Sequence, residues 1–178
     1  MNEIYISLMC KMKKGIKILS VILAVLLLCF LYLWFNNDIG VSKKNIVSDA
    51  RVEQAISSEW DVIEQTTDEL SAMIFYDDLK EEHTFSVYAN WDGLSFGYFF
   101  THGGKDIGIL NGVCEFVYSS LEEKAVISMN SQRASSLNMT DGNTVMTIEL
   151  DPDKPFALVV GENLLLSFFD ENGNVVFE

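Results

Sequence analysis

An apolar stretch at residues 16–35 constrains this chain more than any other feature of its sequence. It reads IKILSVILAVLLLCFLYLWF, and Lys17 is its only charged residue. Twenty helical residues rise about 30 Å, which matches the hydrocarbon core of a bilayer. Because a helix satisfies its own backbone hydrogen bonds, which lipid cannot do, the stretch predicts a transmembrane helix in contact with the lipid bilayer.

Charges and aromatic residues around this stretch predict its orientation. Four lysines precede it or lie at its start: Lys11, Lys13, Lys14 and Lys17. Tyr32 and Trp34 lie at its other end, where aromatic residues occupy membrane interfaces. Since basic residues accumulate on the cytoplasmic side, we expect residues 1–15 in the cytoplasm and the C-terminal region outside the cell membrane.

A cleaved secretory signal is the alternative interpretation of the stretch. Signal peptides have a shorter apolar region, about 7–15 residues, followed by a small-x-small cleavage site. Here the run ends in Leu33-Trp34-Phe35, and the nearest such pair, Gly40 and Ser42, lies well beyond it. These features favour a retained anchor. A start at Met12 is a further alternative, and it would leave the predicted topology unchanged.

The charge is distributed unequally on the two sides of the stretch. Residues up to Lys17 carry a net charge of +3, whereas the rest of the chain has eight basic and 25 acidic residues, a net charge of −17. Such a domain repels nucleic-acid phosphates, so we expect no nucleic-acid partner. Solubility is the simpler explanation of the charge, and attraction to cations or a basic partner is the alternative.

Beyond the stretch, the sequence predicts a linker, a helical segment and a β domain. Residues 36–47 begin with a polar run and predict the linker. Within 48–75, apolar residues recur every three or four positions and predict an amphipathic helical segment. From residue 76 to 178 the apolar residues alternate or form short runs between turns, which predicts strands. We expect 48–75 to pack on 76–178 as one extracytoplasmic unit.

About eight or nine short strands, mostly sequential, predict an antiparallel β-sandwich or a curled sheet. The fold class is therefore α+β, with a transmembrane helix and an amphipathic helix ahead of the sheet. The sequences TDGN at 140–143 and ENGN at 171–174 have strong turn chemistry. Cys114 alternates with Phe116 and Tyr118, so we expect it to be a small core residue rather than a reactive thiol.

One motif suggests hydrolysis but lies in the wrong context. Residues 93–97 read GLSFG, which fits G-x-S-x-G, and His102 follows soon after. In a hydrolase the serine lies on a turn between a strand and a helix. Here the pattern leads from a hairpin turn into a predicted strand, so we reject the hydrolase interpretation of Ser95 and expect no catalytic residue.

Metal and cofactor sites are also not predicted. The chain has two histidines, His83 and His102, which disfavours a multi-histidine site. The acidic run at 77–82 lacks the glycine-centred spacing of a calcium loop, and a solvated connection explains it. The segment that begins at Asp170 resembles the start of a calcium loop. Counted from Asp170 as position one, however, Gly173 is at position four, whereas a calcium loop requires glycine at position six.

Three residues are weak candidates for contact with a partner: Trp91, His102 and Lys105. Trp91 lies at a predicted hairpin tip, where a tryptophan can anchor a partner, although it can also fold back on Phe75 or Tyr76. His102 and Lys105 lie in a glycine-rich segment at 101–108 that can carry a binding site or simply link two strands.

These observations predict a single-pass, membrane-anchored protein with a non-catalytic β domain that binds or scaffolds an envelope protein or polymer. A pilin-like envelope subunit is the alternative, because that class also joins an apolar N-terminal helix to an antiparallel sheet. Its usual marker is a glycine with glutamate five residues later, whereas Gly15 is followed at that spacing by Ser20. A small hydrolase is the third hypothesis.

Overall fold

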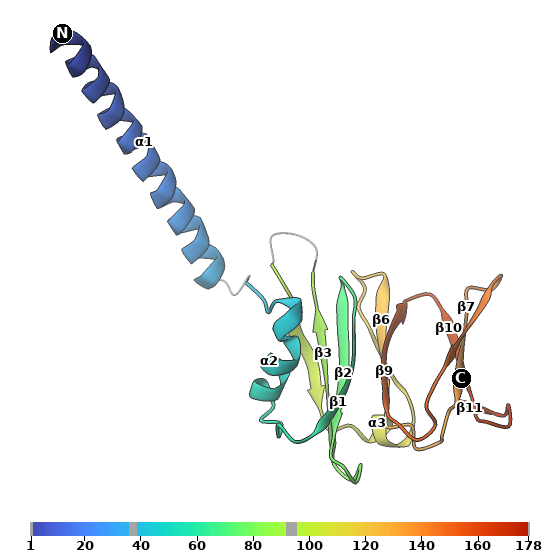
Figure 1. The fold of residues 1–178 in the computed structure, drawn as a ribbon. Coiled ribbons are helices and arrows are strands. Elements are labelled where there is room, and N and C mark those ends of the chain that lie inside the picture. The colour runs from blue at the N-terminus through green and yellow to red at the C-terminus, as the bar shows by residue number, and fades with distance from the viewer. Residues whose placement is uncertain (1, 36–38, 92–95, 178) are drawn as a thin grey trace. The chain divides into compact units, whose positions relative to one another are not determined.

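A computed structural model describes residues 2–35, 39–91 and 96–177 (Figure 1). The chain divides into two compact units, Met1–Ile39 and Gly40–Glu178. The second unit already includes residues of the predicted linker at 36–47, because Val41 forms an antiparallel bridge with Tyr98. Folded structure therefore begins earlier than the composition of that segment indicates.

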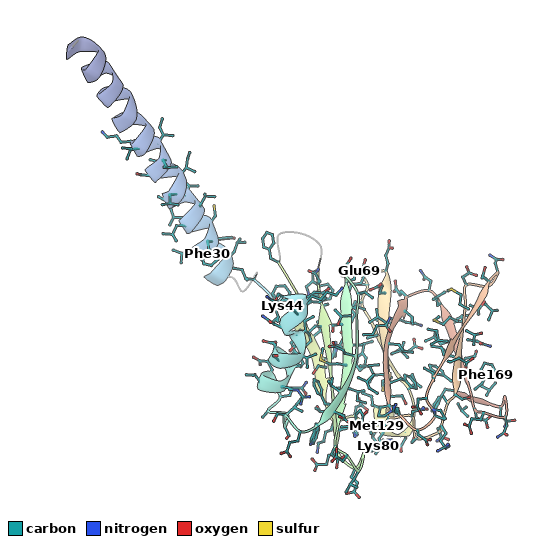
Figure 2. All side chains as sticks on the ribbon, viewed as in Figure 1. Phe30, Lys44, Glu69, Lys80, Met129 and Phe169 are labelled. Carbon is teal, nitrogen blue, oxygen red and sulfur yellow. The ribbon has the colours of Figure 1, made fainter. Side chains whose placement is uncertain are left out.

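The first unit contains one long helix, α1 (Asn2–Phe35). Its segment Ile16–Leu33 has a mean hydropathy of 2.8, and none of these residues is buried. Side chains project from all sides of this helix in Figure 2, and Leu19 and Leu23 are 66% and 68% exposed. By length and composition this helix can cross a membrane, a test that a signal sequence also meets.

The second unit is built mainly from strands. Its described residues form eleven of them: β1 (Asp61–Thr66), β2 (Leu70–Tyr76), β3 (His83–Ala89), β4 (Phe99–Gly104), β5 (Cys114–Val117), β6 (Glu123–Ser128), β7 (Ser136–Thr140), β8 (Val145–Glu149), β9 (Phe156–Gly161), β10 (Leu165–Phe169) and β11 (Val175–Phe177). Three short helices accompany them: η1 (Lys43–Asn45), α2 (Ile46–Glu53) and α3 (Ile107–Asn111).

The strands form three antiparallel sheets rather than one sandwich or a closed barrel. The first sheet has the order β1-β2-β3-β4, the middle sheet β5-β6-β9, and the third sheet β11-β10-β7-β8. Figure 1 shows them following one another from α2 to the C-terminal strands. The antiparallel pairing confirms the predicted arrangement in outline, while the division into three sheets is new.

The middle sheet is buried on both of its faces. Ala125 and Ile127 of β6 pack in one apolar cluster with residues of β2 and β3. Between them in the sequence, Val126 points the other way and packs with residues of β7 and β10. Because successive side chains on a strand alternate between faces, this sheet forms the central layer between the first and third sheets.

Helix α2 covers the remaining face of the first sheet. Ile46 and Ala50 of α2 are buried in a cluster with Met73, Phe75 and Tyr88. The hydroxyl of Tyr88 also donates a hydrogen bond of 2.8 Å to Asp49 of the helix. The unit therefore has four layers, one of helix and three of sheet.

The amphipathic helical segment predicted at 48–75 is wrong beyond Glu53. Helix α2 ends there, and residues 61–66 and 70–75 of the predicted helix instead lie in β1 and β2. Every residue of β2 is buried, with Leu70 and Ile74 facing the middle sheet and Met73 facing α2. A strand buried on both faces has no alternating pattern, so its apolar spacing can imitate that of a helix. Because β1 and β2 were predicted as helix, the structure has eleven strands where the sequence predicts eight or nine.

The C-terminal end of α2 is closed by a strained residue. Ala55 has a φ of +52°, in the left-handed region that glycine usually occupies after a helix. Its N–H bonds to Val52 O at 3.3 Å, and the N–H of Ile56 bonds to Arg51 O at 2.9 Å. This pair of hydrogen bonds is a Schellman motif, and Ile56 also packs against the core beneath α2.

Replacing Ala55 with glycine should therefore stabilise the domain. We expect Ala55→Gly to raise the free energy of unfolding by about 0.5–1 kcal/mol, because glycine adopts a positive φ without the Cβ clash. Urea unfolding of the full chain in detergent, followed by tryptophan fluorescence, measures the change. The matched control, Val52→Gly inside α2, should lower stability by about 0.5 kcal/mol. A destabilising Ala55→Gly would contradict the explanation.

Candidate functional site

The candidate site begins with a β-bulge in β4. Along the pairing of β3 with β4, Val87 opposes His102, whereas Tyr88 opposes Phe100. Thr101 is therefore the extra residue of a bulge. Bulges change the direction in which neighbouring side chains point, and this one has a specific consequence for Thr101 and His102.

Thr101 and His102 both reach the hydroxyl of Tyr118, the residue after β5. Thr101 Oγ1 lies 2.6 Å from Tyr118 Oη, and His102 Nδ1 lies 2.9 Å from the same oxygen. On a regular strand two successive side chains point to opposite faces. The bulge is the reason that both contact one hydroxyl group.

The proton positions in this chain of hydrogen bonds follow from counting donors. Thr101 has one hydroxyl proton and donates it to Val87 O, which can only accept, at 2.9 Å. Tyr118 must then donate its own proton to Thr101. His102 Nδ1 must in turn donate to Tyr118, so the neutral ring carries its proton on Nδ1 and leaves Nε2 as an acceptor.

Aromatic rings surround this hydrogen-bonded chain. Trp91 packs edge-on against Tyr118, with ring centroids 5.5 Å apart, and His102 lies 5.5 Å from Phe116. Phe116 stacks on Phe85 of the core at 5.0 Å. We call Trp91, His102, Phe116 and Tyr118 the aromatic cluster. His102 is exposed and the other three are half-buried, so the cluster is rooted in the core and reaches the surface.

Tyr118 is the titratable group at the centre of the cluster. Burial of the phenol raises the pKa of Tyr118 above its ordinary value. The phenol therefore stays protonated at neutral pH and both donates and accepts a hydrogen bond. The edges of Trp91 and His102 supply the polar groups that such clusters use in recognition.

The structure brings two of the three predicted contact residues together. Trp91 and His102 meet on Tyr118, and the ring contact of Trp91 is with this tyrosine instead of Phe75 or Tyr76. Lys105 lies elsewhere, with its Nζ 3.7 Å from Glu82 Oε2. Tyr118 and Thr101 were not predicted, although the alternation of Tyr118 with Cys114 and Phe116 indicated a shared face.

The other sequence candidates do not join this site. Ser95 lies outside the described residues. The acidic run forms the turn between β2 and β3, where Asp77 Oδ1 accepts the N–H of Glu82 at 2.9 Å. Cys114 packs against the core as predicted, and burial raises the pKa of its thiol. Within the described residues, His, Cys, Asp and Glu form no group of three that could hold a metal ion.

Comparison with known proteins adds no assignment. No protein-family model, no curated protein and no solved structure matches this chain. The geometry of the aromatic cluster and the apolar helix are therefore the basis for the function proposed below.

The proton order in the cluster can be tested through the tautomer of His102. Nitrogen NMR of the imidazole rings should show the Nδ1–H form at a pH where the ring is neutral. In Thr101→Val, Tyr118 loses its acceptor and donates to His102 Nδ1 instead, so the Nε2–H form should replace it. His83 is the internal reference, because its Nε2 faces the carbonyl of Asp106. An unchanged tautomer in the variant would contradict the proton order.

Proposed function

We propose that this chain is a single-pass, membrane-anchored protein whose β domain lies outside the membrane and binds an envelope protein or polymer without catalysing a reaction. The observation that carries the proposal is the apolar character of Ile16–Leu33 in α1. Across Ile16–Leu33 no residue is buried. Soluble proteins rarely leave apolar patches larger than a few hundred Å² in water, so this helix needs a lipid environment.

The lysines before the apolar segment support the proposed orientation. A positive N-terminal flank favours the cytoplasmic side, and the second unit then lies on the opposite side of the bilayer. The net charge of −17 beyond the segment agrees with a solvated domain in that position. The apolar run is longer than a signal peptide requires, which favours retention of the anchor.

The aromatic cluster supports the binding role. Tryptophan and tyrosine are enriched among the residues that contribute most to protein interfaces. Here Trp91 packs edge-on against Tyr118, and the hydroxyl of Tyr118 is fixed by its hydrogen bond with Thr101. Side chains fixed in this way lose little conformational entropy when a partner binds. The protonated phenol of Tyr118 beside a surface histidine provides recognition groups without an activated nucleophile.

The anchor can be tested by charging the centre of α1. Each arginine there costs about 2.5–3.5 kcal/mol for insertion, so Leu23→Arg with Leu27→Arg should release the protein from membranes. Alkaline carbonate extraction and flotation of cell membranes measure this. The control, Val52→Arg on the exposed side of α2, should stay in the membrane fraction. Release of the unaltered chain would contradict a retained anchor, whereas an N-terminus cut after Gly15 would keep the anchor and favour the pilin-like alternative.

The binding role can be tested with variants of the aromatic cluster. The full chain, immobilised in detergent, should capture a protein or polymer from a cell-surface extract of the source organism. Trp91→Ala should weaken capture by about tenfold or more, as for a central interface residue. His102→Gln changes an exposed residue and should weaken capture without affecting folding.

Phe96→Ala is the matched control, because Phe96 is 56% exposed and lies outside the cluster. Capture that is equal for all four proteins would place the binding surface elsewhere. Turnover of a small substrate that His102→Gln abolishes would contradict the non-catalytic role.

A further inference from the structure

A second site lies on the other face of the first sheet. It is a pocket of about 540 Å³ between the end of α2 and the adjoining ends of β3 and β4. Six of the residues that line it carry the argument: Gln54, Trp60, Glu82, Thr84, Gly104 and Lys105. Its volume lies within the range of small-ligand sites, and the residues of the aromatic cluster do not line it.

The floor of the pocket is held rigid by one amide. Gln54 Oε1 accepts a hydrogen bond of 3.0 Å from Thr84, and Nε2 donates to Phe85 O at 3.0 Å and to Ser86 Oγ. On the strand side, Gly104 has a φ of +123°, and a Cβ there would meet no atom within 4 Å. The floor is preorganised, and open space adjoins its edge.

The walls carry two groups with unused binding capacity. Trp60 is half-buried, and within the described residues its indole N–H has no acceptor. The Glu82 side chain is 61% exposed, and its ion pair with Lys105 is long at 3.7 Å. An indole together with a carboxylate is suited to a cationic group, which gains a cation–π contact and a charge-assisted hydrogen bond.

The charge of the whole domain selects the same kind of ligand. A net charge of −17 beyond the apolar segment raises the local concentration of cations and steers basic partners toward the surface. We propose that this pocket binds an arginine side chain presented by a basic partner. Lys105 competes with that side chain from within the protein, because its ammonium already neutralises Glu82.

The pocket and the aromatic cluster are separate sites. Trp91 follows Asn90, whose N–H bonds to Glu69 O before the start of β2, whereas Glu82 shares a turn with Lys80 after the end of β2. Glu69 and Lys80 lie at opposite ends of the first sheet in Figure 2. A negative result in the test of one site therefore does not count against the proposal for the other site.

The test uses the full chain in a neutral detergent and N-acetyl-L-arginine amide as the probe. The uncharged analogue N-acetyl-L-citrulline amide has the same shape and is the control ligand. NMR of ¹⁵N-labelled indoles, with the Trp60 signal assigned through Trp60→Phe, reports occupancy. We expect a saturable shift of the Trp60 signal with the arginine probe and none with citrulline.

Two substitutions should change the affinity in opposite directions. Glu82→Gln should weaken binding by about two- to fivefold, as expected for a partly exposed ion pair, while Glu81→Gln in the same turn should not. Lys105→Ala should tighten binding by a similar factor because it frees Glu82. Lys44→Ala controls for the change in net charge.

Three results would overturn the proposal. They are a Trp60 signal that does not shift, equal effects of Glu81→Gln and Glu82→Gln, and weaker binding in Lys105→Ala. The first would exclude the pocket as the site, and the second would indicate nonspecific attraction to the acidic surface. The third would show that Lys105 does not compete with the arginine probe for Glu82.

Discussion

The rest of the β domain depends on the burial of the middle sheet on both faces. Strands that are apolar on each side cannot be left against water, so β6 and β9 require a cover on both sides. Ala125 and Ile127 meet the first sheet, while Val126 and Val160 meet the third. Gln65 of β1 adds a specific contact at the edge, where its amide accepts the N–H of Val159 at 3.1 Å.

This layering explains where the surface sites lie. As an edge strand of the middle sheet, β5 brings Phe116 and Tyr118 against β4, an edge strand of the first sheet. The aromatic cluster is therefore a junction between two sheets, and the bulge at Thr101 adjusts its geometry. The pocket beside Trp60 is the corresponding junction between the first sheet and α2. Both sites occur where neighbouring layers end, which is where side chains can be fixed by the core and still reach solvent.

Much of the β domain could be predicted because its signals are local. The turn at 140–143 has Gly142 at a φ of +94°, and the turn at 171–174 has Gly173 at +79°, as their turn chemistry indicates. Strand β2, at the end of the segment at 48–75, could not be predicted in the same way, because burial on two faces removes the alternation that identifies a strand. The meeting of Trp91 with Tyr118 joins residues far apart in the sequence, and no local pattern carries that information.

The sequence by itself determined the apolar length of the N-terminal helix, the acidic charge beyond it, and most strand and turn positions. These properties depend on composition and on neighbours a few residues apart. Only the tertiary structure decided that the strands divide into three sheets, that Thr101 and His102 share one hydroxyl, and that Lys105 lies beside Glu82. Those outcomes depend on which sheet faces are covered by distant parts of the chain. Which residues are buried is therefore decided only when all the layers pack together.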